Sequence, residues 1–138
     1  MSVIATDTQR YSNCVKREFG PEYGYCKKMI TVNGPAASIA IGTVLGMVTA
    51  TGKYKVVETS AADGSQVAAV VVVGDANGHT LTTSMAATTD TKFLVIYRGP
   101  SAVSDTSLSY GASVTPGANV AAAQAQLVAA GIDVLTTI

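Results

Sequence analysis

The chain has 138 residues, of which 48% are hydrophobic and only 13% are charged. This length indicates one domain with a core of its own. The nine basic and nine acidic residues cancel, so the chain lacks the basic surface that nucleic-acid-binding proteins carry, and direct binding of nucleic acid is not expected. Soluble domains average about 25% charged residues, and the low value here favours an assembly component whose surface is covered by partners.

The N-terminus lacks the basic segment and apolar run of a secretory signal. The longest apolar run, residues 67–73, is far shorter than the roughly 18 residues of a membrane span. We therefore expect synthesis in a cytoplasm and no membrane contact. In that compartment Cys14 and Cys26 are expected as free thiols, and a disulfide formed after release into oxidising surroundings is the alternative.

Residues 1–35 differ from the remainder of the chain. They are polar, contain half of the tyrosines and two Gly-Pro pairs, and sustain neither a helical nor a strand period. This composition predicts an extended arm with local turns. Tyrosine offers a large contact area with one polar group, so the arm is expected either to dock on a neighbouring molecule or to pack on this chain's own core.

The first half of the remaining chain is predicted to form strands. Residues 36–49 form an apolar, strand-like run that Gly42 and Gly46 interrupt, and glycine within a strand often marks a bulge or a close backbone approach. A hairpin turn and a strand at 54–59 follow. After a loop centred on Asp63-Gly64, residues 67–73 are apolar on both faces, which predicts a central strand.

The second half begins with a long polar stretch, for which we predict one irregular edge strand at 80–85. Residues 91–98 (TKFLVIYR) are rich in β-branched and aromatic residues and predict a strong strand. Only short apolar fragments follow until residues 118–130, whose apolar positions recur at helical spacing. A closing strand is predicted at 132–135.

The sequence contains no convincing catalytic constellation, so we expect no enzyme, no cofactor and no metal site. The segment from Gly46 to Lys53 resembles a phosphate-binding loop, but five residues separate its glycines where that loop has four. Tyr54 also stands where a Mg²⁺-binding Ser or Thr is required. The sole histidine, His79, follows Asn77-Gly78, which predicts an exposed turn residue.

Four phrases in order give the chain a family resemblance. They are GTVLGMVTATGKY at 42–54, ADGSQVAAVVV at 62–72, RGPSAVSDTSLSYGASV at 98–114 and AAAQAQLVAAGIDV at 121–134. From about residue 41 to residue 134 the chain resembles the lambda-type bacteriophage head decoration proteins. The two cysteines do not belong to the pattern of that family.

The resemblance implies a mainly β fold, a small β-clip or β-tulip-like domain with one C-terminal helix, over residues 36–138. It implies a structural virion protein that binds the major capsid protein as a homotrimer, outside the expanded capsid at threefold and quasi-threefold sites. There it would stabilise the shell against the pressure of packaged DNA. Residues 1–35 would be the capsid-binding arm, with contacts expected from Tyr11, Lys16, Arg17, Phe19, Tyr23, Tyr25, Lys27 and Lys28.

Two other classes of function remain open from the residues alone. A surface-displayed binding module, either carbohydrate-binding or adhesive, would need exposed aromatic residues on a rigid face. The chain has no Trp and only eight aromatic residues, half of which lie in the predicted arm. A small β-clip nucleotide hydrolase would need an acidic constellation, which the sequence does not display.

Overall fold

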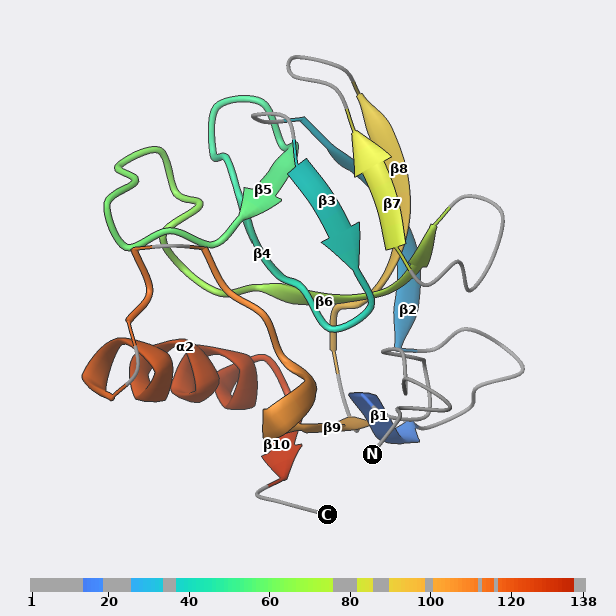
Figure 1. Cartoon of the computed structure of the whole chain (residues 1–138), viewed down its shortest axis with the longest axis vertical. Helices are drawn as coiled ribbons and strands as arrows, with labels where there is room; N and C mark the ends of the chain where they lie inside the picture. The colour runs from blue at the N-terminus through green and yellow to red at the C-terminus, as the bar shows by residue number, and fades with distance from the viewer. Residues whose placement is uncertain are drawn as a thin grey trace, which may run out of the picture.

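The computed structural model describes residues 14–18, 26–33, 37–75, 82–85, 90–98, 101–111, 113–115 and 117–135. Within these ranges the fold is mainly β with one α-helix near the C-terminus, as the sequence predicts. The strands form a closed five-stranded barrel, a three-stranded sheet and a two-stranded sheet. Figure 1 shows the barrel strands in the upper part of the molecule, with the helix and the three-stranded sheet below them.

The barrel is closed by a strand from the N-terminal part of the chain. Its strands, in spatial order, are β2 (Lys27–Val32), β5 (Tyr54–Val56), β4 (Val44–Met47), β6 (Val70–Asp75) and β8 (Thr91–Ile96). Strand β2 pairs antiparallel with β8 along its whole length. On its other side it pairs with β5 through one parallel register pair, Val32 with Tyr54. Among neighbouring strands of the barrel, β2 and β5 therefore have the fewest paired residues.

Strand β6 separates two hydrophobic cores. Val70 and Val72 belong to the core inside the barrel, to which all five barrel strands contribute. Val71 and Val73 belong to a second core on the outside. Because successive side chains point to opposite faces of a strand, a strand buried on both faces must be apolar throughout. The prediction of a central strand is confirmed, although β6 begins three residues later than predicted.

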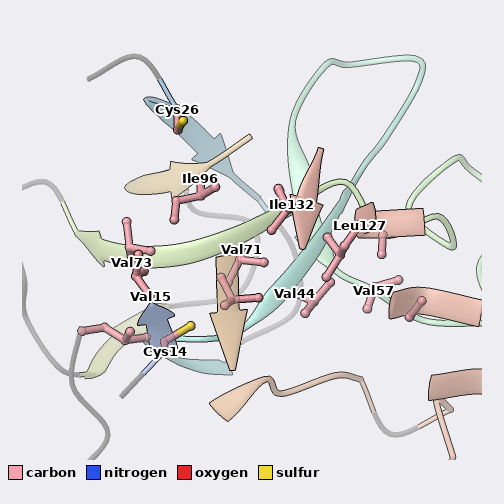
Figure 2. Close-up of a cluster of buried hydrophobic side chains, with 14 of the residues drawn as sticks. Cys14, Val15, Cys26, Val44, Val57, Val71, Val73, Ile96, Leu127 and Ile132 are labelled. Atoms are coloured by element: carbon pink, nitrogen blue, oxygen red, sulfur yellow. The ribbon is translucent and has the colours of Figure 1, made fainter. Parts of the chain in front are cut away.

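The second core lies between the barrel and the C-terminal helix, α2 (Ala118–Ala129). Figure 2 shows Leu127 and Ile132 pointing towards Val44 and Val71 of the barrel. Each of these four side chains is at most 1% exposed, and burying a side chain of this size contributes about 1.5–3 kcal/mol. The predicted helix at 118–130 is confirmed to within one residue, and this apolar face holds it on the barrel.

The three-stranded sheet joins the two ends of the described chain. Its central strand is β9 (Ser101–Ser104), flanked by β1 (Val15–Glu18) and β10 (Ile132–Leu135). β1 is antiparallel to β9 and β10 is parallel to it. A short 3₁₀ helix, η2 (Asp105–Ser107), follows β9. The predicted closing strand is confirmed, whereas the sequence indicated only a short apolar fragment where β9 lies.

The two-stranded sheet pairs β3 (Ala37–Ala40) with β7 (Thr82–Met85). The sequence predicted one run over residues 36–49, which the structure divides into β3 and β4. A turn at residues 41–43 separates them, and Gly42 there adopts a φ of 97°. The two strands consequently enter different sheets. The edge strand predicted at 80–85 is present as β7.

The described part of residues 1–35 belongs to the folded body, in contrast to the extended arm predicted from the sequence. β1 is an edge strand of the three-stranded sheet and β2 is a barrel strand. Both cysteines are buried thiols of the second core and are not joined by a disulfide. Figure 2 shows the two side chains apart from each other, Cys26 near the top and Cys14 near the bottom of the view. The aromatic residues of this segment, for which the sequence left docking on a neighbour or packing on the chain's own core open, lie outside the described residues.

Candidate functional site

The structure disperses the residues predicted to contact a capsid. Lys16 and Arg17 lie on β1, next to β9, whereas Lys27 and Lys28 lie on β2 in the barrel. The four aromatic residues of the prediction fall outside the described ranges, as does His79: they are Tyr11, Phe19, Tyr23 and Tyr25. The four described residues are therefore divided between two sheets, and the role of all eight in attachment stays a prediction.

Lys28, near the start of β2, belongs to a cluster of two basic side chains and one aromatic ring. Its Nζ lies 4.6 Å from the centroid of the Tyr97 ring, and the Arg98 guanidinium carbon lies 5.0 Å from the same centroid. The Tyr97 amide donates to the carbonyl of Cys26, which aligns the ring with β2. An exposed cation over an aromatic ring contributes about 0.5–1 kcal/mol. Two positive charges are thereby presented together at the end of β8.

An open groove of about 470 Å³ runs along β2. One wall is made of four consecutive β2 residues, 28–31, and the other of Met47 and the hairpin residues 51–54. Met29 and Met47 both line it, with 45% and 41% of their surface exposed. Large apolar side chains that remain this exposed, grouped in one hollow, are typical of an interaction surface.

A polar cluster closes one end of this groove. Asp90 accepts a hydrogen bond of 2.6 Å from the Asn33 side chain and ion-pairs with Lys53 at 3.0 Å. These contacts hold the pKa of the Asp90 carboxyl below its ordinary value, the bond from Asn33 having the largest effect and that from Lys53 the next. The cluster joins the ends of β2, β5 and β8, and so fixes the two walls relative to each other.

The loop at 60–66 contains the DGSQ phrase and folds back on β4. Asp63 ion-pairs with Lys55 at 2.7 Å and accepts hydrogen bonds from the amide and hydroxyl of Ser65. The side-chain bond from Lys55, and then those from Ser65, hold the pKa of this carboxyl well below its usual range. Gln66 turns back to accept from the amide of Gly64 at 2.8 Å. The loop is thus fixed by its own side chains.

Gly46 is required where this loop crosses β4. A Cβ at this position would collide with the carbonyl oxygen of Ser65 and lie 2.6 Å from that of Val67. The close backbone approach expected from the sequence is therefore confirmed at Gly46. Where the loop crosses β4, it also brings Ala68 next to α2. The Ala68 amide donates to the side chain of Gln126 in α2 at 2.7 Å. The loop, β4 and the helix are joined at one place.

Helix α2 presents an uncharged, apolar face to solvent. Leu127 and Ala123 are buried against the barrel. The exposed positions of the helix are all Ala or Val: Ala118, Ala121, Ala122, Ala125, Val128 and Ala129. A surface helix normally carries polar residues on its outer side, and this composition agrees with the low overall charge of the chain.

No group of three or more His, Cys, Asp or Glu side chains comes together within the described ranges, nor does any helix there have the length and apolar character needed to cross a membrane. Sequence reasoning did not identify Met29, Met47 or Tyr97 as surface features. Their proximity comes from strand pairing between distant segments, which no local pattern encodes.

Comparison with known proteins agrees with the phrases found in the sequence. A search of curated proteins finds no match to the chain. The model of a protein family, described as bacteriophage lambda head decoration protein D, matches residues 12–132. This match spans most of the chain, from β1 through α2 to the first residue of β10. The chain therefore belongs to the family of the bacteriophage lambda head decoration protein D.

Proposed function

We propose that this protein binds the outside of the expanded phage capsid as homotrimers at threefold and quasi-threefold sites. Its partner there is the major capsid protein, and its role is to hold neighbouring subunits of the shell against the pressure of packaged DNA. The match to the head decoration family over residues 12–132 is the observation that carries this proposal. The protein would be made in the host cytoplasm and act without catalysis.

The physical properties of the chain support a mechanical role. The barrel is closed, and a second core fastens the helix and the three-stranded sheet to it. Such a body transmits force between contact points without changing shape, because closely packed interiors are barely compressible. A trimer engages the shell through three copies of each contact, and linked contacts can raise the overall affinity by about 10²–10⁴.

The N-terminal residues are the proposed attachment arm, with a revised boundary. Because β1 and β2 belong to the folded body, deleting all of residues 1–35 would remove a barrel strand together with any arm. Residues 1–13 precede the first described residue, Cys14. A deletion of residues 1–13 removes none of the described strands, and circular dichroism of the shortened protein checks that it still folds.

The test is a decoration assay with undecorated expanded heads. The full-length protein is expected to appear by electron microscopy as trimeric densities on expanded heads and not on unexpanded proheads. Heads saturated with it should resist heating that opens undecorated heads. Absence of density on expanded heads at saturating protein would contradict the proposed function. Full saturation by the protein lacking residues 1–13 would contradict the arm alone.

A further inference from the structure

The groove along β2 exposes the main-chain edge of that strand. The Asn33 amide donates to the carbonyl of Tyr54 in β5 at 3.0 Å, whereas the carbonyl of Cys26 accepts from Tyr97, which follows β8. Main-chain groups alternate between the two edges of a strand with a period of two residues. Those of Met29 therefore point, like the amide of Asn33, away from β8 and towards the groove.

This edge has room for another strand. Within the described ranges, the pairing of β2 on the groove side consists of the single register pair between Val32 and Tyr54. Four consecutive residues of β2 line the groove. Consecutive residues point to opposite faces of a sheet, so a hollow that all four line is expected to lie along the strand's edge. The hairpin that carries Met47 forms the opposite wall.

The side chains of the groove indicate what it would bind. Met29 and Met47 offer exposed, adaptable apolar surface, and methionine packs against side chains of varied shape. Lys53 is compensated by Asp90. Lys28 lies over the Tyr97 ring, and no acidic side chain within the described ranges forms an ion pair with it. The groove therefore favours an extended peptide with an apolar side chain and a carboxylate.

We propose that an extended segment of the capsid shell protein adds to β2 as an edge strand in this groove. Its main chain bonds to that of Met29, its apolar side chain lies between Met29 and Met47, and its carboxylate faces Lys28. Strand addition of this kind takes its affinity from main-chain hydrogen bonds and its specificity from side-chain pockets. This inference rests on the proposed capsid function and adds a contact separate from residues 1–13.

Photo-crosslinking identifies the protein segment that binds in the groove. A benzophenone amino acid is placed at Met47 and, as the control, at Ser109, which is exposed and bridges Thr43 just before β4, at the other end of that strand from Met47. Each variant is bound to undecorated expanded heads, irradiated, and analysed by mass spectrometry. We expect position 47 to cross-link to an acid-bearing segment of the shell protein to which position 109 does not cross-link. Cross-links from position 47 only to a second decoration subunit, or none on fully decorated heads, would overturn the proposal.

Substitutions test the energetic contribution of the groove. Met47→Lys places a charge in the apolar part of the groove, and Ser109→Lys adds the same charge at an exposed position outside it. We expect Met47→Lys to weaken binding to heads at least about tenfold and Ser109→Lys less than about twofold. Equal binding by both variants would refute the groove contact, while failure of the unmodified protein to bind heads would refute the proposed function itself.

Met29→Pro tests the main-chain bond in the same assay. Proline lacks the amide hydrogen and is accommodated at strand edges where that hydrogen does not serve the sheet. The amide of Met29 points away from β8, so the β2–β8 ladder can persist in this variant. A folded Met29→Pro protein, checked by circular dichroism, should bind heads at least about tenfold more weakly. Unchanged binding would exclude strand addition.

Discussion

The carboxylate of Glu58 binds both the backbone amide and the side-chain hydroxyl of Ser113, and so ties the loop before α2 to the end of β5. The amide bond measures 2.9 Å, and the hydroxyl donates to the same oxygen. Thr59 adds a bond of 2.8 Å from its hydroxyl to the carbonyl of Ser113. One residue of the loop is therefore held through its amide, its hydroxyl and its carbonyl.

Removing Glu58 should destabilise the fold more than removing the Ser113 hydroxyl. Glu58→Ala leaves two partly buried donors of Ser113 without their acceptor, at an expected loss of about 1–3 kcal/mol in the free energy of unfolding. Ser113→Ala removes one donor and should lose about 0.5–1.5 kcal/mol. Urea titration measures both, with the exposed Ala62→Ser as the control. A Glu58→Ala protein as stable as Ala62→Ser would disprove the tie.

The stability of the Asp63 loop should depend on pH in the acid range. The folded-state pKa of Asp63 lies below its ordinary value of 3.8, first because of Lys55 and then because of Ser65. A lowered pKa means that the carboxylate stabilises the folded state fully above the unfolded-state pKa, and that this contribution is lost as the pH falls below it. Asp63→Asn should therefore be less stable than wild type at neutral pH, with the difference shrinking below about pH 4.

Chemical unfolding at pH 7 and at pH 3 measures this difference. Lys55→Gln serves as the matched variant, because it removes the largest contact that lowers the Asp63 pKa. The double variant should lose less stability than the sum of the two single losses. A difference between wild type and Asp63→Asn that is the same at both pH values would contradict the role of the carboxylate.

Gly46→Ala should destabilise the crossing of the loop over β4. The added Cβ would meet the carbonyl oxygens of Ser65 and Val67, which are backbone atoms and cannot turn aside. Overpacking of this kind costs about 1–3 kcal/mol or more. Gly52→Ala is the comparison, because Gly52 has a φ of 72° with no atom within 4 Å of a Cβ there. Its cost should stay at about 1–2 kcal/mol, from backbone strain alone.

The attachment of α2 should depend on Leu127. Its side chain is fully buried against the barrel, while the next residue, Val128, is half exposed. Leu127→Ala is expected to lower the free energy of unfolding by about 2–5 kcal/mol, and Val128→Ala by less than about 1 kcal/mol. Thermal and denaturant unfolding of the two variants measure this contrast. Equal losses would mean that the helix is not anchored by its buried face.

The two cysteines should be protected from reagents in the folded protein. Cys14 is 0% exposed and Cys26 is 1% exposed, and a thiol-specific reagent needs access to the sulfur. Ellman's reagent should titrate two thiols per chain in denaturant and react slowly in native buffer. Two thiols titrated at once under native conditions would contradict the burial. No reaction in denaturant without reductant would indicate a disulfide.

The elements that sequence reasoning found are those whose local pattern agrees with their environment. α2 was found because its buried residues, Ala123 and Leu127, recur at helical spacing and because alanine, the best helix former, fills most of its exposed positions. β6 is apolar on both faces because it separates two cores. In both elements the local sequence agrees with the structure that the element adopts.

The elements that it missed owe their structure to distant partners. β9 is short and contains Ser101 and Ser104, yet both serines are buried. The Ser101 hydroxyl is satisfied by the carbonyl of Arg98 at 3.2 Å, a contact that no periodicity reveals. β2 begins with two lysines and therefore resembled a solvated arm. The groove between Met29 and Met47 arises where β2 lies beside the hairpin of β4 and β5, which is distant in sequence. Local patterns in the sequence therefore could not predict it.

The pairing of Lys27 with Ile96, and of Val15 with Val103, has a consequence for biosynthesis. The ribosome makes β2 and β1 early, but their partners emerge only after most of the chain has been translated. Loop closure over such separations is slow relative to the formation of local contacts. The barrel therefore cannot close co-translationally until β8 has left the exit tunnel, and the nascent chain must carry β2 without its β8 partner until then and β1 without β9 for longer.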